Sequence, residues 1–155
     1  VTKKGITVKA STDAGVFYAF QTLRQMTSDG KVKEVKCCEI TDSPRFPYRG
    51  LHFDVSRHFR SIGFLKKQID AMARYKMNKM HIHLTDATGW RLQIDSYPRL
   101  TSFAAWRSEP IWKEWWNGDR MYAEEGSEGA YGGYYTKEEM RRVIWKTKER
   151  EQNYV

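Results

Sequence analysis

The sequence predicts an α/β fold in which parallel strands alternate with helices. Residues 51–55 and 80–84 each alternate apolar with polar side chains, a pattern typical of strands. Between them, residues 64–77 repeat apolar side chains at the spacing of one helical face. A strand, a helix and a second strand in this order form a βαβ unit, so the two strands are expected to run parallel.

The helix of this unit is expected to pack against the sheet through one stripe and to end near Asn78. The stripe consists of Leu65, Ile69, Met72 and Ala73. These residues recur at positions i, i+4, i+7 and i+8, which place them on one side of a helix. The sequence therefore predicts which side chains of this segment form the core.

Residues 1–42 are predicted to form the end of a small α+β domain. Alternating apolar residues indicate strands over residues 6–10 and 32–40. The segment between them has apolar residues at helical spacing, with Asp13 placed as the N-cap of the helix. One helix and two strands in about 40 residues are too few to bury a core of their own. The rest of the chain, residues 43–155, is assigned to a second domain.

A further helix and strand are predicted near the end of this second domain. Thr136 and Glu139 have the spacing of a capping box, which marks a helix start. The inner face of this helix is expected to comprise Met140, Val143, Ile144 and Thr147. Tyr154 and Val155 then begin a third strand. A sheet this small has an open edge, so the isolated chain is expected to be marginally stable or to self-associate through that edge.

A long connection, residues 87–135, separates the second strand from this helix. Loops of that length are usually functional or disordered. Disordered segments are poor in aromatic residues, so this connection is expected to be folded. Its aromatic residues are Trp90, Trp106, Trp112, Trp115, Trp116, Tyr122, Tyr131, Tyr134 and Tyr135. Aromatic rings beyond the carboxyl end of a strand suit sugar binding; alternatively, they only pack the connection onto the body.

The stretch HIHLTDATGW, residues 81–90, allows three interpretations. His81 and His83 share one face of a strand and could bind zinc, but no further His or Cys cluster accompanies them. Alternatively, the two histidines only bond neighbouring strands while Asp86 caps a turn. In the third interpretation Asp86 acts at the carboxyl end of its strand, where barrels and doubly wound sheets place their chemistry.

Arg57 occupies the matching position after the preceding strand. Neighbouring parallel strands bring Arg57 and Asp86 to the same rim of the sheet. An arginine fork and a carboxylate at this rim are suited to gripping hydroxyl groups from two sides. A purely structural ion pair is the alternative interpretation of the same spacing.

The composition excludes several classes of protein. At 40% hydrophobic and 30% charged residues the chain is globular, and no run of about 18 apolar residues could span a membrane. The net charge of +8 permits nucleic-acid binding. The positive residues are scattered and no recognition motif accompanies them, so no nucleic-acid partner is expected. Adjacent Cys37 and Cys38 form no CxxC pattern, and no metal or cofactor is expected.

Several stretches resemble one enzyme family. SPRFPYRGLHFDVSRHF, KMNKMHIHLTD, GWR and YGGYYTKEEMRRVI occur in that order. They resemble the opening of the catalytic barrel of β-N-acetylhexosaminidases of glycoside hydrolase family 20. The earlier ITVKASTDAGVFYAFQTLRQM resembles the end of the small α+β domain that precedes this barrel. The resemblance covers nearly the whole chain and implies a partial (β/α)8 TIM barrel comprising its first two to three strands.

The resemblance also implies roles for two residues. Arg57 matches the arginine that binds hydroxyls of the terminal N-acetylhexosamine. Asp86 matches the aspartate that orients a downstream histidine linked to the general acid, which is a supporting catalytic role. The family commonly has DDQGW where this chain has DATGW. Ala87 and Thr88 therefore replace an acid and an amide, and some hydrogen bonds of the rim are expected to differ.

By the same resemblance, the parent enzyme removes terminal β-linked GlcNAc or GalNAc from oligosaccharides or glycoconjugates by substrate-assisted retaining hydrolysis. The aspartate and glutamate that hold the acetamido group and transfer the proton lie after a later strand, beyond Val155. The chain alone is therefore expected to be inactive. A non-catalytic carbohydrate-binding or scaffold fragment is the alternative. The family resemblance suggests a periplasmic, secreted or lysosome-like compartment.

Overall fold

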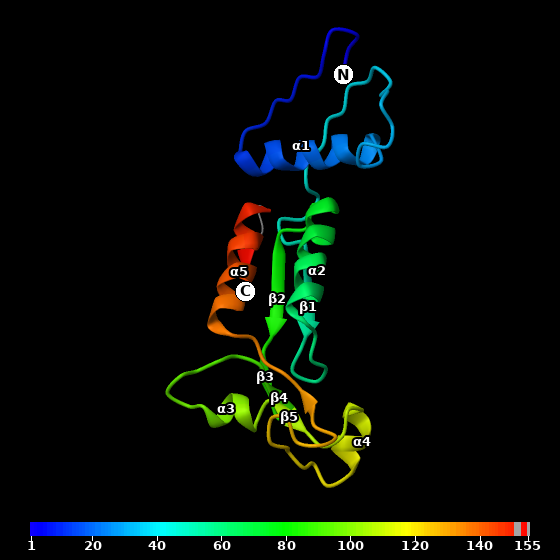
Figure 1. Ribbon diagram of the computed structural model, residues 1–155. Coiled ribbons are helices and arrows are strands. Elements are labelled where there is room, and N and C mark those ends of the chain that lie inside the picture. Colours follow the sequence, from blue (N-terminus) through cyan, green and yellow to red (C-terminus); the bar gives the residue numbers. More distant parts are fainter. Residues whose placement is uncertain (151–152, 155) are drawn as a thin grey trace.

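The computed structural model describes residues 1–150 and the backbone of residues 153 and 154. Figure 1 shows an elongated molecule with three parts. Helix α1 (Asp13–Met26) and its flanking segments lie at one end, and a body of helices and strands lies in the middle. The connection between β2 (Lys79–His83) and α5 (Lys137–Glu149) forms the other end. No helix in the described part of the chain is both long and apolar enough to cross a bilayer.

The body contains a three-stranded parallel sheet in the order β1-β2-β7. Strand β1 (Gly50–Asp54) pairs with β2 in register from Gly50↔Lys79 to Asp54↔His83. Strand β7 (Asn153–Tyr154) pairs with the other edge of β2. The parallel βαβ arrangement predicted from the sequence is thus confirmed. Val155, which was also assigned to the third strand, lies outside the described residues.

Helix α2 (Ile62–Arg74) and α5 contact each other and share one hydrophobic core with the sheet. All four predicted residues of the α2 stripe are buried. Apolar burial of this kind is the main stabilising contribution in a folded domain. The buried members of the core are Val55, Leu65, Ile69, Met72, Met80, Ile82, Tyr135, Met140 and Val143.

Both ends of α2 lie earlier in the chain than the predicted residues 64–77. Ser61 Oγ caps the start by accepting from the Phe64 amide at 3.3 Å. The helix ends at Arg74, because Lys76 adopts a φ of 58° and the left-handed conformation does not continue a right-handed helix. Asn78 instead fastens the start of β1, since its Oδ1 accepts from the Arg49 amide at 3.0 Å.

The capping box predicted for α5 is confirmed. Thr136 Oγ1 accepts from the Glu139 amide at 3.1 Å, and Glu139 Oε2 accepts from the Thr136 amide at 2.9 Å. Met140, Val143 and Thr147 of the predicted inner face are buried, and Ile144 is half-buried. The local sequence signal thus fixes both the start of this helix and its orientation on the sheet.

The N-terminal part departs from prediction. Helix α1 forms, but its N-cap is Thr12, whose Oγ1 accepts from the Gly15 amide at 3.1 Å, and Asp13 is already helical. The predicted strands over 6–10 and 32–40 are wrong. A strand requires a neighbouring backbone, and among the described residues these segments acquire little more than the backbone pairing of Val1 with Cys38.

The connection after β2 is folded, as its aromatic content predicted. It contains the hairpin of β3 (Thr85–Asp86) with β4 (Gly89–Trp90), and the pairing of β5 (Trp106–Arg107) with β6 (Tyr131–Gly132). Two short helices, α3 (Arg99–Ser102) and α4 (Trp112–Asn117), complete it. Trp115 is buried and packs edge-on against Tyr122, which supports the packing interpretation for this tryptophan. Trp112 and Trp116 stay exposed.

Candidate functional site

The structure brings Arg57 and Asp86 together at the carboxyl ends of β1 and β2. Arg57 Nη2 lies 2.7 Å from Asp86 Oδ2. Their side chains are 37% and 33% exposed, so the pair remains accessible to a ligand. Arg57 lies in the turn that follows β1, and Asp86 lies in β3, directly after β2. The expected placement on one rim of the parallel sheet is therefore observed.

Two further residues, Asp54 and His83, complete this cluster. Asp54 Oδ2 lies 2.9 Å from Arg57 Nη1, and Asp54 Oδ1 accepts from the Arg57 amide at 3.1 Å. His83 Nε2 lies 3.2 Å from Asp86 Oδ2 and 3.1 Å from the Thr85 carbonyl oxygen. Both of these neighbours are acceptors, so the proton is assigned to Nε2. We call Asp54, Arg57, His83 and Asp86 the rim cluster.

The predicted site at the sheet rim comprised Arg57 and Asp86 only. Asp54 was not included, and the one functional role considered for His83 was that of a zinc ligand together with His81. The signal was present, because the strand alternation places Asp54 and His83 on the polar face of the sheet. Their partnership depends on the register, which aligns Asp54 with His83 across the two parallel strands. Only the paired sheet reveals that register.

Asp86 is held in its ionised form. The Ala87 amide donates to Asp86 Oδ1 at 2.6 Å, and this bond, followed by the charges of Arg57 and His83, lowers the pKa of the carboxyl group. The carboxylate is thus negative at neutral pH. A fixed negative charge beside a guanidinium suits the binding of neutral polar groups, since donors and acceptors are presented together.

The histidines do not form a metal site in the described part of the chain. His81 lies directly across from His52, and their rings meet edge-to-face at a centroid distance of 4.6 Å. His83 belongs to the rim cluster instead. No group of three or more His, Cys, Asp or Glu side chains within the described ranges is arranged to hold a metal ion. The histidine contacts between neighbouring strands agree with the structural interpretation for His81.

The turn of the β3–β4 hairpin contains Ala87 and Thr88. Thr88 is buried, and its Oγ1 has no hydrogen-bond partner among the described residues. The following Gly89 carbonyl accepts from the buried Ser56 hydroxyl at 2.8 Å. This bond ties the hairpin to the turn after β1, and so it connects the two backbone segments that present Arg57 and Asp86.

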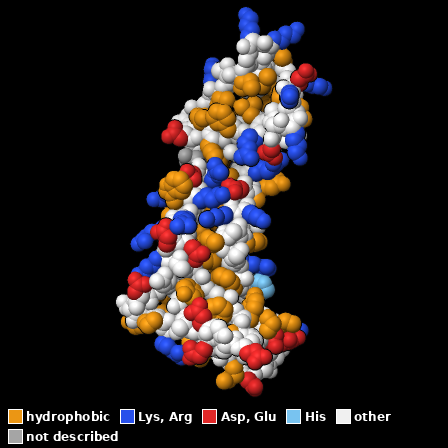
Figure 2. Space-filling model, in the orientation of Figure 1, with side chains coloured by type: hydrophobic (Ala, Val, Ile, Leu, Met, Phe, Trp, Pro, Cys, Tyr) orange, Lys and Arg blue, Asp and Glu red, His pale blue; other side chains and the backbone are white. Residues whose placement is uncertain are grey.

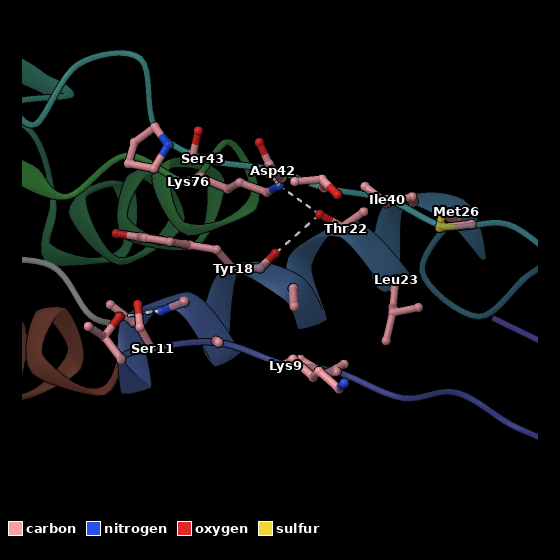
Figure 3. Close-up of a pocket in the computed structure, with 18 of the residues that line it drawn as sticks. Lys9, Ser11, Tyr18, Thr22, Leu23, Met26, Ile40, Asp42, Ser43 and Lys76 are labelled. Carbon is pink, nitrogen blue, oxygen red and sulfur yellow. Dashed lines mark hydrogen bonds and ion pairs between the residues drawn. The ribbon is translucent and has the colours of Figure 1, made fainter.

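A large hollow lies elsewhere, beside α1 (Figure 3). It measures about 1350 Å³. Figure 3 shows Lys76 reaching Thr22 across it, and the Lys76 Nζ atom donates to Thr22 Oγ1 at 2.6 Å and pairs with Asp42. The positive charge of Lys76 is thus already paired with the carboxylate of Asp42. No member of the rim cluster lines this hollow. The candidate site is therefore the rim cluster.

Comparison with known proteins decides the family. Residues 46–153 match the catalytic domain of glycosyl hydrolase family 20, and residues 1–43 match domain 2 of the same family. The chain belongs to glycosyl hydrolase family 20. Its β1–α2–β2 and α5–β7 elements, with the connection between them, are the first part of a family 20 TIM barrel.

Relatives in family 20 are similar over nearly all of this chain. A β-hexosaminidase of Akkermansia muciniphila is 39% identical over 146 residues, which cover 93% of this chain and 27% of that protein. The crystal structure of an exo-β-N-acetylglucosaminidase of Vibrio harveyi in complex with N-acetylglucosamine is 40% identical. It superimposes with a TM-score of 0.81 over 99% of this chain and 24% of that one. The chain thus spans about a quarter of the length of such relatives.

Proposed function

We propose that the protein carrying this chain removes terminal β-linked N-acetylhexosamine from oligosaccharides or glycoconjugates by retaining, substrate-assisted hydrolysis. The observation that carries the proposal is the rim cluster, which places Arg57 and Asp86 in contact at the carboxyl end of a family 20 barrel sheet. Similar proteins are named β-hexosaminidases, and one is described in complex with N-acetylglucosamine. In this mechanism the 2-acetamido oxygen of the sugar attacks its own anomeric carbon.

In this proposal Arg57 binds hydroxyl groups of the terminal sugar. Its Nη1 is engaged by Asp54 and its Nη2 by Asp86, which hold the guanidinium plane in place. A guanidinium has five N–H donors in a rigid fork, so donors remain for the sugar after both ion pairs have formed. A preorganised donor loses less conformational entropy on binding than a mobile one.

Asp86 is proposed to act in support of catalysis rather than in proton transfer. Its lowered pKa keeps the carboxylate charged, and Oδ2 contacts both Arg57 and His83. A carboxylate that stays ionised can orient a neighbouring histidine by accepting a hydrogen bond from its ring N–H. The acid/base pair of the mechanism is assigned to a later part of the enzyme, so the contribution of this chain is to bind and orient the sugar.

The proposal is tested in a complete family 20 barrel that includes this chain. Arg57→Lys is expected to lower kcat/KM for p-nitrophenyl N-acetyl-β-glucosaminide about 10- to 100-fold, since an ammonium cannot replace the planar fork. Arg60→Lys is the matched control, because Arg60 lies three residues away and its guanidinium stacks on Phe64 at 5.4 Å. Equal activity of the Arg57→Lys enzyme and this control would make Arg57 structural.

The 155-residue chain itself is expected to release no nitrophenol above the uncatalysed rate. General acid assistance alone contributes about 10²–10⁴ in rate. Asp54 and Asp86 both form ion pairs with Arg57, so neither is assigned as the general acid. Turnover by the purified chain would show that the catalytic groups have been assigned wrongly. An inactive complete enzyme that still binds N-acetylglucosamine would instead favour the non-catalytic carbohydrate-binding alternative.

A further inference from the structure

Two arginines of the connection, Arg91 and Arg107, are completely buried. Neither forms an ion pair with a carboxylate in the part of the chain that the structure describes. Burying a charged group without a counter-ion is unfavourable unless hydrogen bonds compensate for the lost water. The interactions of these two guanidinium groups therefore need an explanation.

Their hydrogen bonds converge on the turn that presents Arg57. Arg91 Nε donates to the Val55 carbonyl at 2.9 Å, and Arg91 Nη2 donates to the Ser56 carbonyl at 2.7 Å. Arg107 Nη1 donates to the carbonyl of Arg57 itself at 2.8 Å. Three successive carbonyl groups, from the end of β1 to Arg57, are thus held by two arginine side chains.

The remaining donors of both arginines bind the connection. Arg91 Nη1 donates to the Gly133 carbonyl at 3.0 Å and also to the Ala105 carbonyl. Arg107 donates to the carbonyls of Glu109 and Pro110, each at 2.6 Å. The two side chains therefore link the turn at residues 55–57 to backbone segments far along the chain.

The residues around Arg91 hold its guanidinium group in place. Arg91 lies across the ring of Phe59, 5.6 Å from its centroid. A Cβ atom at Gly89 would lie 2.2 Å from Arg91 Nη2, so glycine is required for the hairpin to pass the guanidinium. Burial lowers the pKa of Arg91 to about 10, which still leaves the group charged at neutral pH. Charged donors make stronger hydrogen bonds to carbonyl groups than neutral ones do.

We propose that Arg91 and Arg107 are positioning residues that set the place of the Arg57 guanidinium by fixing its backbone. This inference rests on the proposed function of Arg57 in binding the sugar. The Arg57 side chain is long and partly exposed, so Asp54 and Asp86 can hold its tip only if its backbone starts from the right place. The two arginines thereby control the rim cluster through the backbone that carries Arg57.

A general structural role would have a different consequence. If Arg91 and Arg107 only stabilise the fold, substituting them would lower the midpoint of unfolding and leave the Arg57–Asp86 contact unchanged in the folded chain. If they are positioning residues, substituting them would weaken that contact in a chain that remains folded. The distinguishing readout is the pKa of the Asp86 carboxyl group, because Arg57 is one of the groups that lower it.

The test is an NMR titration of the side-chain carboxyl carbons in the unaltered chain and in three variants. The variants are Arg57→Ala, Arg91→Lys and Arg107→Lys. The pKa of Asp86 is expected to rise in Arg57→Ala, and to rise part of the way in both lysine variants. Lysine keeps the positive charge, so such a rise reports displacement of Arg57. Asp70 is the internal control, because its carboxylate pairs with Lys146 and Arg150 rather than with any member of the rim cluster, and its pKa should not change.

The outcomes separate the two proposals. An unchanged Asp86 pKa in both folded lysine variants, with a rise in Arg57→Ala, would overturn the positioning role and leave the function of Arg57 intact. A rise in the lysine variants, with N-acetylglucosamine binding unaffected by Arg57→Ala, would overturn the proposed function alone. No rise in Arg57→Ala would contradict the Arg57–Asp86 contact itself.

A second measurement decides the matter if neither lysine variant folds. In the unaltered chain, the Nε–H protons of Arg91 and Arg107 are expected to exchange with water roughly tenfold or more slowly than that of exposed Arg141. Exchange at the rate of Arg141 would show that the hydrogen bonds to the turn are not maintained in solution, and the positioning role would be rejected.

Discussion

The body and the α1 end of this chain carry similar apolar patterns but bury them very differently. In the body, Leu65 and Met80 are completely buried between helix and sheet. At the other end, Ile6, Phe20 and Ile40 are each more than half exposed. Figure 2 shows the resulting apolar patches at the end of the molecule that contains α1. An amphipathic pattern thus yields a core only where a second apolar surface faces it.

The attachment of α1 to the body is correspondingly polar. Gln25 Nε2 donates to the Arg74 carbonyl at 2.6 Å, and Arg74 also pairs with Asp29. Exposed polar contacts of this kind contribute little net stability. We infer that a single substitution can change the free energy of unfolding more in the body than at the α1 end.

The largest effect is expected from truncating the core. Leu65→Ala removes a buried side chain and should lower the free energy of unfolding by about 2–5 kcal/mol. Phe20→Ala, on the half-exposed face of α1, should change it by less than about 0.5 kcal/mol. Urea denaturation followed by circular dichroism measures both. Comparable losses from the two variants would erase the contrast between the regions.

The second prediction concerns the open edge of the sheet. Strand β1 forms one edge, and Leu51 on it is partly exposed. We expect the chain to self-associate there, and Leu51→Lys should weaken association about tenfold, or about 1.4 kcal/mol, because lysine on an edge strand opposes further pairing. Sedimentation velocity over a range of concentrations provides the measurement.

Phe20→Lys is the control for association, since it places the same charge on the apolar patch at the opposite end. If this variant dissociates the protein and Leu51→Lys does not, association occurs through α1 instead of the sheet. A strictly monomeric unaltered chain with a sharp melting transition would contradict both versions.

The third prediction uses pH to measure the contact between α2 and α5. Burial tends to raise the pKa of Asp70, but hydrogen bonds and charges from Lys146 and Arg150 outweigh it, so the net pKa is lowered. A lowered folded-state pKa stabilises the fold above the unfolded pKa near 3.9, and this contribution disappears as the pH falls through the folded value. Asp70→Asn should therefore cost about 0.2–1 kcal/mol at pH 7, because the pair is half-exposed.

The effect of the same variant should shrink as the pH is lowered from 7 to 2, because the carboxyl group of the unaltered chain takes up a proton as the pH falls through its lowered folded-state pKa. Denaturation of both proteins at the two pH values makes the comparison. An equal loss at pH 2 and pH 7 would mean that the effect comes from packing rather than from charge.

The smallest effect is expected at Thr88. Its buried hydroxyl has no partner among the described residues, so Thr88→Val removes an unsatisfied group while keeping the shape of the side chain. The free energy of unfolding should stay within about 0.5 kcal/mol or increase. A loss above about 1 kcal/mol would show that the hydroxyl binds a water molecule or another group. Ser56→Ala, which breaks a buried bond to Gly89, is the contrasting variant and should destabilise the chain.

What the sequence could predict follows the same division between local and distant interactions. The α2 stripe and the α5 capping box depend on residues within one helix, and both were predicted correctly. The strands over 6–10 and 32–40 were not, because alternation indicates a strand only where another backbone is available. Thr12 and Asp13 are both good caps by type, and only the backbone conformation of Thr12 distinguishes them.

The candidate site was predictable only in part. Arg57 and Asp86 follow two patterned strands, so their meeting at one rim followed from the βαβ arrangement. The roles of Asp54 and His83 required the strand register. Arg91 and Arg107 have the residue type of surface positions, and their burial depends on carbonyl groups up to 50 residues away. No local pattern in the sequence indicates such contacts.

The distribution of tryptophan has a practical consequence for spectroscopy. Five of the six tryptophans, all except Trp145, lie in the connection between β2 and α5. Intrinsic fluorescence therefore reports mainly on the connection, whereas far-ultraviolet circular dichroism reports on α1, α2 and α5. Buried Trp115, beside Tyr122, should shift its emission to longer wavelength when the connection opens. Recording both signals during one denaturation separates the loss of the arginine-linked connection from the loss of the helices.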